Sequence, residues 1–408
     1  MFNKEAVLNS IKEYDSFYMY DQSTILEYSN QLKDNFEGIE FLYSNKTNPN
    51  PEVLKTVFGQ GFGSDSASLN EVLMCKNAGL AKEKIYYSAP GKSFYDIREA
   101  MDISIITADS ISEIHRIQQV AKEKGTVAKI GIRINPRFGF FKESGAASKF
   151  GIDEDVVYEN KEMLKSLENV DIIGIHVHLS SQELDIDRLK TYYRNMFQLA
   201  DRVKEELEID LDFLNLGSGI GIAYEKKDSP LDVADLGKTA SELVKEFKEK
   251  MPNTTVFIET GRYVVTKAGV YATKVLDRKT SYGKTYVILC NTLNGFVRPS
   301  IAKAIPTYST EEHPKPWEPM FTSKDAFQYI PLTESTEMEK VTLVGNLCTS
   351  TDLIADDIEM PKLEYGDALV ITNAGSYAAV VTPMQFASLN PPAQLFLTKQ
   401  GEVINTLV

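Results

Sequence analysis

The chain has few of the residues that build metal centres and disulfide frameworks. Its 408 residues include four histidines and three cysteines, which are Cys75, Cys290 and Cys348. Because the cysteines are odd in number and far apart, no disulfide framework is implied. No Cys-x-x-Cys pair accompanies the few histidines, so a structural zinc site is not expected.

Long apolar runs and basic clusters are also missing. No stretch reaches about 18 uninterrupted apolar residues, and the first residues lack an apolar secretory core, so a soluble, cytoplasmic protein is expected. The net charge is −14 at pH 7, and no cluster of lysine and arginine is interleaved with aromatic residues. Neither nucleic acid nor an anionic membrane is therefore an expected partner.

The chain is rich in β/α alternation over roughly its first 260 residues. Eight short apolar runs are separated by helical patterns: Phe41–Ser44, Phe62–Ser64, Ile85–Ser88, Ile103–Thr107, Ala128–Ile134, Val170–His178, Phe213–Leu216 and Val256–Ile258. Eight such units predict a closed (β/α)8 barrel rather than an open doubly wound sheet. Long helical patterns fit Thr24–Phe36, Asp185–Leu207 and Leu231–Met251.

Two of the helix starts read as capping boxes, Ser68 with Glu71 and Ser110 with Glu113. The second of these helices runs to Gly125, a residue suited to the C-terminal cap.

Beyond about residue 265 the pattern changes to β-type runs separated by turn signals. The runs are Val270–Asp277, Lys284–Cys290, Lys340–Leu347, Ala368–Thr372 and Leu395–Lys399, with hairpin turns expected at 281–283 and 400–401. We therefore predict a barrel over residues 25–265 and a mostly antiparallel β domain made of residues 1–24 and 266–408.

Polar residues follow the barrel runs, where the carboxyl ends of the strands would meet. Lys46 follows the first run; such a lysine usually reaches to solvent, and the alternative is a Schiff-base lysine kept unprotonated by burial. Asp65 follows the second run, where it either caps the next helix or serves a site. Glu259 follows the last run.

The sixth and seventh runs end in histidines and glycines. His176 and His178 share a strand face and could pair on a metal, but no third ligand is apparent and the neighbouring Ser180 and Ser181 suit an oxyanion better. The run 217–221 spaces its glycines as G-x-G-x-G, which is a weak dinucleotide fingerprint but a good phosphate loop.

Together these residues are the inventory of a pyridoxal 5′-phosphate enzyme. Lys46 would form the Schiff base, the glycine loop and Ser181 would take the phosphate, and His178 would pack on the ring. Glu259 would pair with the pyridine nitrogen and keep it protonated, which would make the ring a strong electron sink.

At this level of detail the sequence resembles the fold-type III, barrel-type pyridoxal phosphate decarboxylases, which include the diaminopimelate, ornithine and biosynthetic arginine decarboxylases. The resemblance runs from Tyr43 to about Pro392. It rests on the segments 43–48, 65–68, 89–93, 133–136, 148–151, 176–182, 217–221, 259–262, 294–299, 348–352 and 375–377. So many short motifs in the right order are more specific than any one of them.

The resemblance implies roles for named positions. Lys46 would hold the cofactor, and a further set would bind or orient it: Asp65, Arg133, His178, Ser181, Gly217, Gly219, Glu259, Gly261, Arg262 and Tyr377. Substrate contacts are implied for Arg262, Arg298, Thr349, Asp352 and Tyr377. Cys348 would protonate the carbanion and would be delivered by the partner subunit of a head-to-tail homodimer; from composition alone it would be a core thiol. No metal is implied.

The substrate shell departs from the family pattern. An acidic residue that binds a distal amino group usually follows the cysteine, but here Thr349 does. Ala302 replaces a tyrosine, and Gln394 and Pro391 replace an acidic residue and an arginine. We therefore expect a modified or carrier-linked amino-acid substrate.

Two alternatives stay open. One is a true meso-diaminopimelate decarboxylase in which Asp352 supplies the distal contact. The other belongs to a different class, a non-catalytic protein that binds pyridoxal phosphate. The presence of Lys46, the glycine loop and Cys348 weighs against the second.

Overall fold

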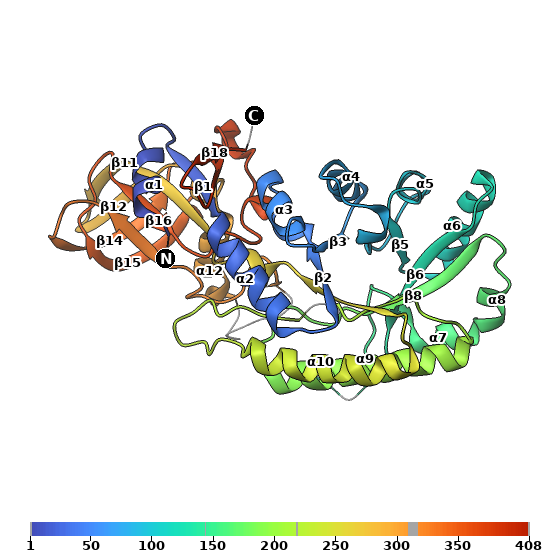
Figure 1. The fold of residues 1–408 in the computed structure, drawn as a ribbon. Helices are drawn as coiled ribbons and strands as arrows, with labels where there is room; N and C mark the ends of the chain where they lie inside the picture. The colour runs from blue at the N-terminus through green and yellow to red at the C-terminus, as the bar shows by residue number, and fades with distance from the viewer. Residues whose placement is uncertain (1, 143, 218, 309–316, 407–408) are drawn as a thin grey trace.

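A computed structural model describes residues 2–142, 144–217, 219–308 and 317–406. Figure 1 shows two parts, a ring of strands surrounded by helices and a sheet-rich part beside it. Each part is built on its own nine-stranded sheet. None of the helices within the described ranges has the length and apolar character needed to cross a membrane.

The first sheet is a closed parallel barrel. Its eight main strands are β2 (Ile39–Ser44), β3 (Gly63–Ser66), β4 (Ile85–Tyr87), β5 (Ile105–Ala108), β6 (Ala128–Asn135), β8 (Val170–His176), β9 (Phe213–Asn215) and β10 (Thr255–Thr260). They follow the order β5-β4-β3-β2-β10-β9-β8-β6, and β5 also pairs with β6, which closes the ring. All eight predicted runs, and the barrel itself, are confirmed. The short β7 (Ile152–Asp153) extends the end of β6.

Side chains fill the barrel interior. Phe213 lies so close to two strands that a Cβ placed on Gly131 or Gly174 would come within 2.6 or 2.4 Å of its ring. Tyr86 and Phe257 pack against the same ring. The interior is therefore a packed core, and a site can form only above it, at the carboxyl ends of the strands.

Helices surround the barrel. They are α2 (Gln22–Asn35), α3 (Pro51–Phe58), α4 (Leu69–Asn77), α5 (Phe94–Ala100), α6 (Ile111–Lys124), α7 (Glu154–Glu159), α8 (Lys161–Lys165), α9 (Ile186–Leu207), α10 (Val233–Lys250) and α11 (Arg262–Val265). The three long helical patterns correspond to α2, α9 and α10. Gly125 caps α6 in the left-handed conformation, as predicted.

The two capping boxes are half right. Ser68 and Ser110 accept hydrogen bonds from the backbone N–H groups of Glu71 and Glu113, so both serines are N-caps. The return bonds to the capping residues are not made, because the Glu71 carboxylate takes the Ala67 N–H and Glu113 is drawn to a buried lysine. A complete box occurs instead at the start of α5, between Ser93 and Asp96.

The second sheet forms the β domain. Its strands are β1 (Ser16–Asp21), β11 (Gly269–Ser281), β12 (Lys284–Leu289), β13 (Tyr329–Leu332), β14 (Met338–Gly345), β15 (Leu353–Pro361), β16 (Ala368–Ile371), β17 (Ala393–Leu397) and β18 (Val403–Asn405). Most pairings are antiparallel, as predicted, whereas β1 with β17 and β12 with β14 are parallel. The helices α1 (Lys4–Ser10) and α12 (Val297–Ala304) belong to the same part of the chain.

Two connections join the barrel to the β domain. β1 lies in the sheet of the β domain, whereas α2, which follows it directly, packs on the barrel helices α3, α10 and α11. At the C-terminal end of the barrel, β10 is the last barrel strand, and β11 is the next strand and belongs to the β domain. The division at residues 25 and 265 stays a prediction.

Candidate active site

Lys46 and Asp65 meet at the carboxyl ends of β2 and β3. Lys46 Nζ lies 2.5 Å from Asp65 Oδ2, and Ser44 Oγ donates to the same oxygen at 2.9 Å. Ser88 Oγ donates to the other carboxylate oxygen at 2.5 Å. Asp65 therefore serves this site, and the alternative that it caps the following helix is wrong, since Ser68 does so.

The charge on Lys46 differs from the expectation. Burial lowers the pKa of Lys46, but the attraction of Asp65, Tyr377 and Glu259 outweighs burial, and the net shift is upward. Its side chain is 42% exposed. The prediction that burial keeps this amine unprotonated is wrong for the protein alone: Lys46 is an ammonium ion held by a carboxylate, and it must lose a proton before it can bond a carbonyl carbon.

Glu259 lies beside both histidines of β8 and the loop that follows. Its Oε1 is 3.0 Å from His176 Nε2 and accepts from Asn215 Nδ2 at 3.0 Å, while its Oε2 is 3.8 Å from His178 Nδ1. Burial raises the pKa of Glu259, but His176, Lys46 and His178 together lower it by a larger amount. The net shift of the Glu259 pKa is downward, so the carboxylate is ionised. Within the described residues no group of three such side chains is placed to hold a metal ion.

His178 is neutral at pH 7. Burial is the main reason that the pKa of His178 falls to about 4. The negative charge of Glu259 raises this pKa, whereas the positive charges of Arg133 and Lys46 lower it. Ser181 Oγ lies 3.3 Å from His178 Nε2. This arrangement suits an aromatic ring that packs on the neutral imidazole of His178 and donates a hydrogen bond to the carboxylate of Glu259.

The glycine loop after β9 runs very close to its neighbours. Gly217 has φ +65°, and a Cβ there would lie 2.1 Å from the Val177 carbonyl oxygen. Gly219 has φ +138°. Gly261 packs on Thr47, whose Oγ1 would be 2.4 Å from an added Cβ. Ser218 lies outside the described residues, so the contacts of this predicted loop are known only at its other positions.

Two buried arginines, Arg262 and Arg298, lie beyond this loop and have different partners. Arg262 pairs with Glu318 at 2.5 Å, and its guanidinium lies 4.9 Å from the centre of the Tyr377 ring. Arg298 is 1% exposed. Its Nη1 donates to the Ser376 carbonyl at 3.1 Å and its Nη2 to Thr322 Oγ1 at 2.7 Å. In this structure Arg298 is not open to the substrate carboxylate predicted for it.

Tyr224 lies between these arginines and was missed by the sequence analysis. Burial raises its pKa, but Arg262 and Arg298 lower it to about 7. The tyrosine follows the glycine loop by three residues, a signal that extending the loop motif would have found. Glu318 and Thr322 were also missed, and their segment carries no periodic pattern.

Arg133, at the end of β6, faces an anion and an aromatic ring. Its Nη1 is 3.6 Å from Asp109 Oδ1, and its guanidinium lies 4.5 Å from the centre of the Phe150 ring. Arg133 therefore connects the loop after β6, through Phe150, to Asp109 at the end of β5.

The structure does not bring the Cys348 loop to these barrel residues. Cys348 is exposed, and Thr349 lines a cavity of about 800 Å³ whose walls all come from the β domain. Asp352 is buried, and its carboxylate accepts from Thr292 Oγ1 and from the backbone N–H groups of Leu293 and Leu347. With both oxygens engaged, Asp352 shapes the loop and is poorly placed to hold a substrate ammonium.

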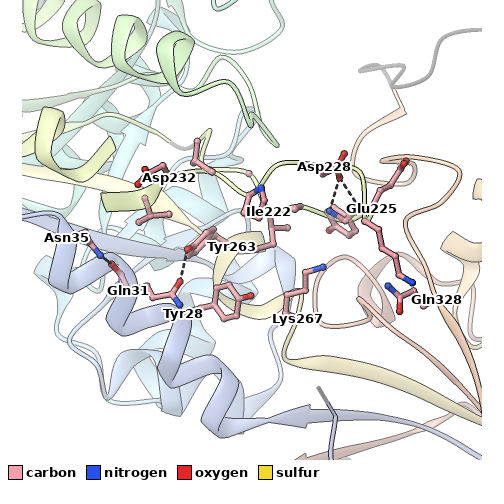
Figure 2. Close-up of a pocket in the computed structure, with 17 residues that line it drawn as sticks. Tyr28, Gln31, Asn35, Ile222, Glu225, Asp228, Asp232, Tyr263, Lys267 and Gln328 are labelled. Atoms are coloured by element: carbon pink, nitrogen blue, oxygen red, sulfur yellow. Dashed lines mark hydrogen bonds between the residues drawn. The ribbon is translucent and has the colours of Figure 1, made fainter. Parts of the chain in front are cut away.

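Two further cavities border the carboxyl ends of the strands. One, of about 550 Å³, is lined by His178, Ser181, Glu318 and the loop after β6. The other, of about 650 Å³, lies between α2, residues 221–233 and α11 (Figure 2). There Tyr263 donates to Gln31, and Asp228 accepts from two backbone N–H groups. Gly221 of the glycine loop lines this second cavity, whereas Lys46, His178 and Glu259 do not.

Comparison with known proteins decides the family. Residues 22–266, more than half of the chain, match the model described as "Pyridoxal-dependent decarboxylase, pyridoxal binding domain". The chain belongs to the pyridoxal-dependent decarboxylases. Those residues cover the entire barrel, so the family and its cofactor, pyridoxal 5′-phosphate, agree with the site built above.

Relatives of this decarboxylase include proteins named for different substrates. It is 32% identical over 390 residues to L-glutamyl-[BtrI acyl-carrier protein] decarboxylase of Niallia circulans, covering 93% of this chain and 88% of that one. It is 28% identical over 388 residues to diaminopimelate decarboxylase of Helicobacter pylori strain J99, covering 93% and 89%. A crystal structure of the Helicobacter pylori diaminopimelate decarboxylase with L-lysine superposes with a TM-score of 0.82 at 25% identity, covering 99% and 96%.

The residues of this decarboxylase fit pyridoxal phosphate. The site holds an amine at Lys46, an ionised carboxylate at Glu259 and a neutral imidazole at His178. Gly217 lets the loop backbone pass close to Val177 and His178, where a Cβ would clash. Arg262, already holding a carboxylate, shows that this edge accepts an anion.

Proposed function

We propose that this decarboxylase removes the α-carboxylate of an amino acid whose distal end carries no charge, such as a glutamyl group bound to a carrier protein. The homodimer, the site-residue roles and the domain boundaries given above are parts of this proposal. The observation that carries it is the burial of Arg298, whose donors are already used within the chain.

The geometry supports the proposed cofactor roles. Lys46 Nζ would be the amine that holds the cofactor, with Asp65 beside it as the partner of its charge. Glu259 would keep a proton on the pyridine nitrogen, and His178 would pack on the ring. The loop at Gly217 and Gly219, with Ser181, Gly261, Arg262 and Tyr377, would receive the phosphate, and Arg133 would help to orient the cofactor. When bound, the cofactor supplies a sink for the electron pair left on the α carbon as CO₂ departs.

We assign the final proton to Cys348 of a second copy of the chain. Cys348 Sγ would hand its proton to the α carbon once CO₂ has left. Its exposure on the β domain, next to a cavity lined only by that domain, supports delivery to another subunit rather than to its own barrel.

The substrate is inferred from two charged groups, a distal ammonium and a distal carboxylate, for which the chain offers no available partner. A distal ammonium would find Thr349 where an acid is expected, which forfeits roughly 1.5–3 kcal/mol of charge-assisted hydrogen bonding. A distal carboxylate would find Arg298 buried under Thr322 and Ser376. Diaminopimelate carries both charges at that end, whereas a glutamyl thioester carries neither. The 32% identity to a carrier-protein glutamyl decarboxylase supports the same choice.

CO₂ release from a substrate panel tests the proposal. The panel contains meso-diaminopimelate, L-ornithine, the N-acetylcysteamine thioester of the L-glutamyl γ-carboxyl and the L-glutamyl-loaded BtrI carrier named for the relative. We expect kcat/KM for the thioesters to exceed that for meso-diaminopimelate at least 100-fold, about 2.7 kcal/mol in transition-state binding. Preference for meso-diaminopimelate would contradict the proposed substrate, and bound cofactor without CO₂ from any compound would support the non-catalytic alternative.

A further inference from the structure

The cavity that reaches His178 has an aromatic wall. It is bounded by residues 136–142 and 144–151, which lie between β6 and β7 and which we call the entry loop. Four phenylalanines of this loop line the cavity: Phe138, Phe140, Phe141 and Phe150. Phe141 is 52% exposed, so the wall continues from the site to the protein surface. No acidic side chain of the described entry loop lines this cavity.

Cations border the outer end of this wall. Lys149 Nζ lies 4.7 Å from the centre of the Phe150 ring, and the Arg188 guanidinium lies 5.4 Å from that of Phe141. Arg137 lies over Tyr158 at 5.4 Å. Lys142 is exposed and lines the cavity itself. Cation–π contacts of this kind hold positive charge at the faces of the rings.

Acidic neighbours offset only part of this charge. Asp155 pairs with Arg137, and Asp185 and Glu183 with Arg188. No ion pair of Lys142 or Lys149 occurs among the described residues. A cationic rim is notable on a chain with a net charge of −14, because that net charge disfavours the approach of an acidic partner.

We propose that the entry loop and its cationic rim dock an acidic carrier protein and receive its pantetheine arm. The arm is uncharged along most of its length, which suits an aromatic channel of about 550 Å³ that ends at His178 and Ser181. The arm's phosphate and the acidic carrier would face Lys142 and Lys149. This inference rests on the proposed carrier-linked substrate and adds the surface that selects the carrier.

Charge reversal on the rim tests the docking. We expect Lys142→Glu combined with Lys149→Glu to raise KM for the L-glutamyl-loaded BtrI carrier at least tenfold with little change in kcat. The same variant should leave kcat/KM for the N-acetylcysteamine thioester within twofold, because that compound lacks the arm's phosphate and the carrier. Added NaCl should raise the wild-type KM for the carrier and have little effect on the variant.

A matched control changes the net charge equally at the other end of the barrel. Lys129→Glu combined with Lys250→Glu replaces two exposed lysines, 62% and 67% accessible, whose partners are exposed or half-buried carboxylates. We expect it to behave like the wild type. An equal rise in KM would show that net charge alone matters and would overturn the docking proposal.

The arm and the carrier can be tested separately. Phe141→Ala should raise KM for both the loaded carrier and the corresponding pantetheine thioester, whereas the rim variant should affect only the carrier. Failure of every thioester to release CO₂ would contradict the proposed function. Turnover of the small thioesters with a carrier KM insensitive to the rim, or no turnover of the carrier, would overturn the docking alone. A rim variant with an altered oligomeric state would assign this face to a subunit interface instead.

Discussion

His178 and Glu259 show how one pocket sets opposite protonation states. Burial disfavours charge on both side chains, yet only the histidine stays neutral. Glu259 is flanked by His176 and Lys46, which favour its negative charge, whereas His178 faces the positive charges of Arg133 and Lys46. The pocket is thus prepared for a ring that carries a positive charge at its nitrogen and presents an apolar face to His178.

This arrangement predicts a pH dependence of stability. The pKa of His178 is about 4 in the folded chain and 6.5 ordinarily, so the unfolded chain binds this proton first as the pH falls. The contribution of His178 is intact above pH 6.5 and is lost towards pH 4, by up to about 3 kcal/mol. Urea unfolding of the cofactor-free protein gives the free energy of unfolding at each pH from 4.5 to 7.5. This free energy should change less steeply with pH in His178→Asn than in the wild type. Parallel slopes would contradict the assignment.

Residues at strand ends could be predicted, and residues brought in by tertiary structure could not. Lys46, Asp65 and Glu259 each follow an apolar run, so their meeting at one end of a barrel follows from the β/α pattern. Glu318 reaches Arg262 from a segment without periodicity, 56 residues later. Nothing local in the sequence indicates that contact.

At the level of elements, a buried ion pair joins the turn after β4 to α6. Lys92 Nζ donates to Glu113 Oε1 at 2.7 Å and to the carbonyl oxygens of Ala89 and Thr107 at 2.6 and 2.8 Å. Both side chains are at most 1% exposed. Burial lowers the pKa of Lys92 despite Glu113, so the pair depends on all of these bonds to remain charged.

Breaking this pair on one side should be costly. We expect Lys92→Met to lower the free energy of unfolding by about 3–5 kcal/mol, because Glu113 would be left buried without its partner. Adding Glu113→Leu should restore much of the loss. Arg98→Met, which breaks the exposed pair with Glu123, should cost no more than about 1 kcal/mol. Urea unfolding measures all of them, and equal losses for Lys92→Met and Arg98→Met would contradict the prediction.

The pair of Lys92 and Glu113 explains why the capping box predicted at Ser110 is incomplete. The Ser-x-x-Glu spacing at Ser110 is the pattern of a capping box, but Lys92 recruits the glutamate from a distant turn. Most of the barrel strands were predictable because they are largely apolar runs buried on both faces, whereas β3 is buried but has the sequence Gly-Ser-Asp-Ser. β15 was not predicted, since its residues alternate between buried and exposed and include adjacent acids at Asp356 and Asp357.

At the scale of the whole molecule, the proposed sharing of sites between subunits predicts complementation. Lys46→Ala should lose the cofactor's visible absorbance and its activity, whereas Cys348→Ala should keep the absorbance and lose most decarboxylation. Mixed and reassociated in equal amounts, the two inactive variants should recover about a quarter of the wild-type activity, because half of the dimers are mixed and each has one intact site. Two variants that both carry Cys348→Ala are the control. No recovery, with mixed dimers verified, would place both residues in one chain's site.

The pairing of β1 with β17 has a consequence for the newborn chain. Phe17 pairs with Ala393, 376 residues later, and β1 is followed at once by the first barrel helix. β11, the other partner of β1, follows the barrel directly, whereas β17 is made much later, so the edge of β1 that pairs with β17 stays open after the barrel strands have left the ribosome. Synthesis therefore passes through a species in which the barrel is complete and one edge of the β domain sheet, at β1, still waits for β17.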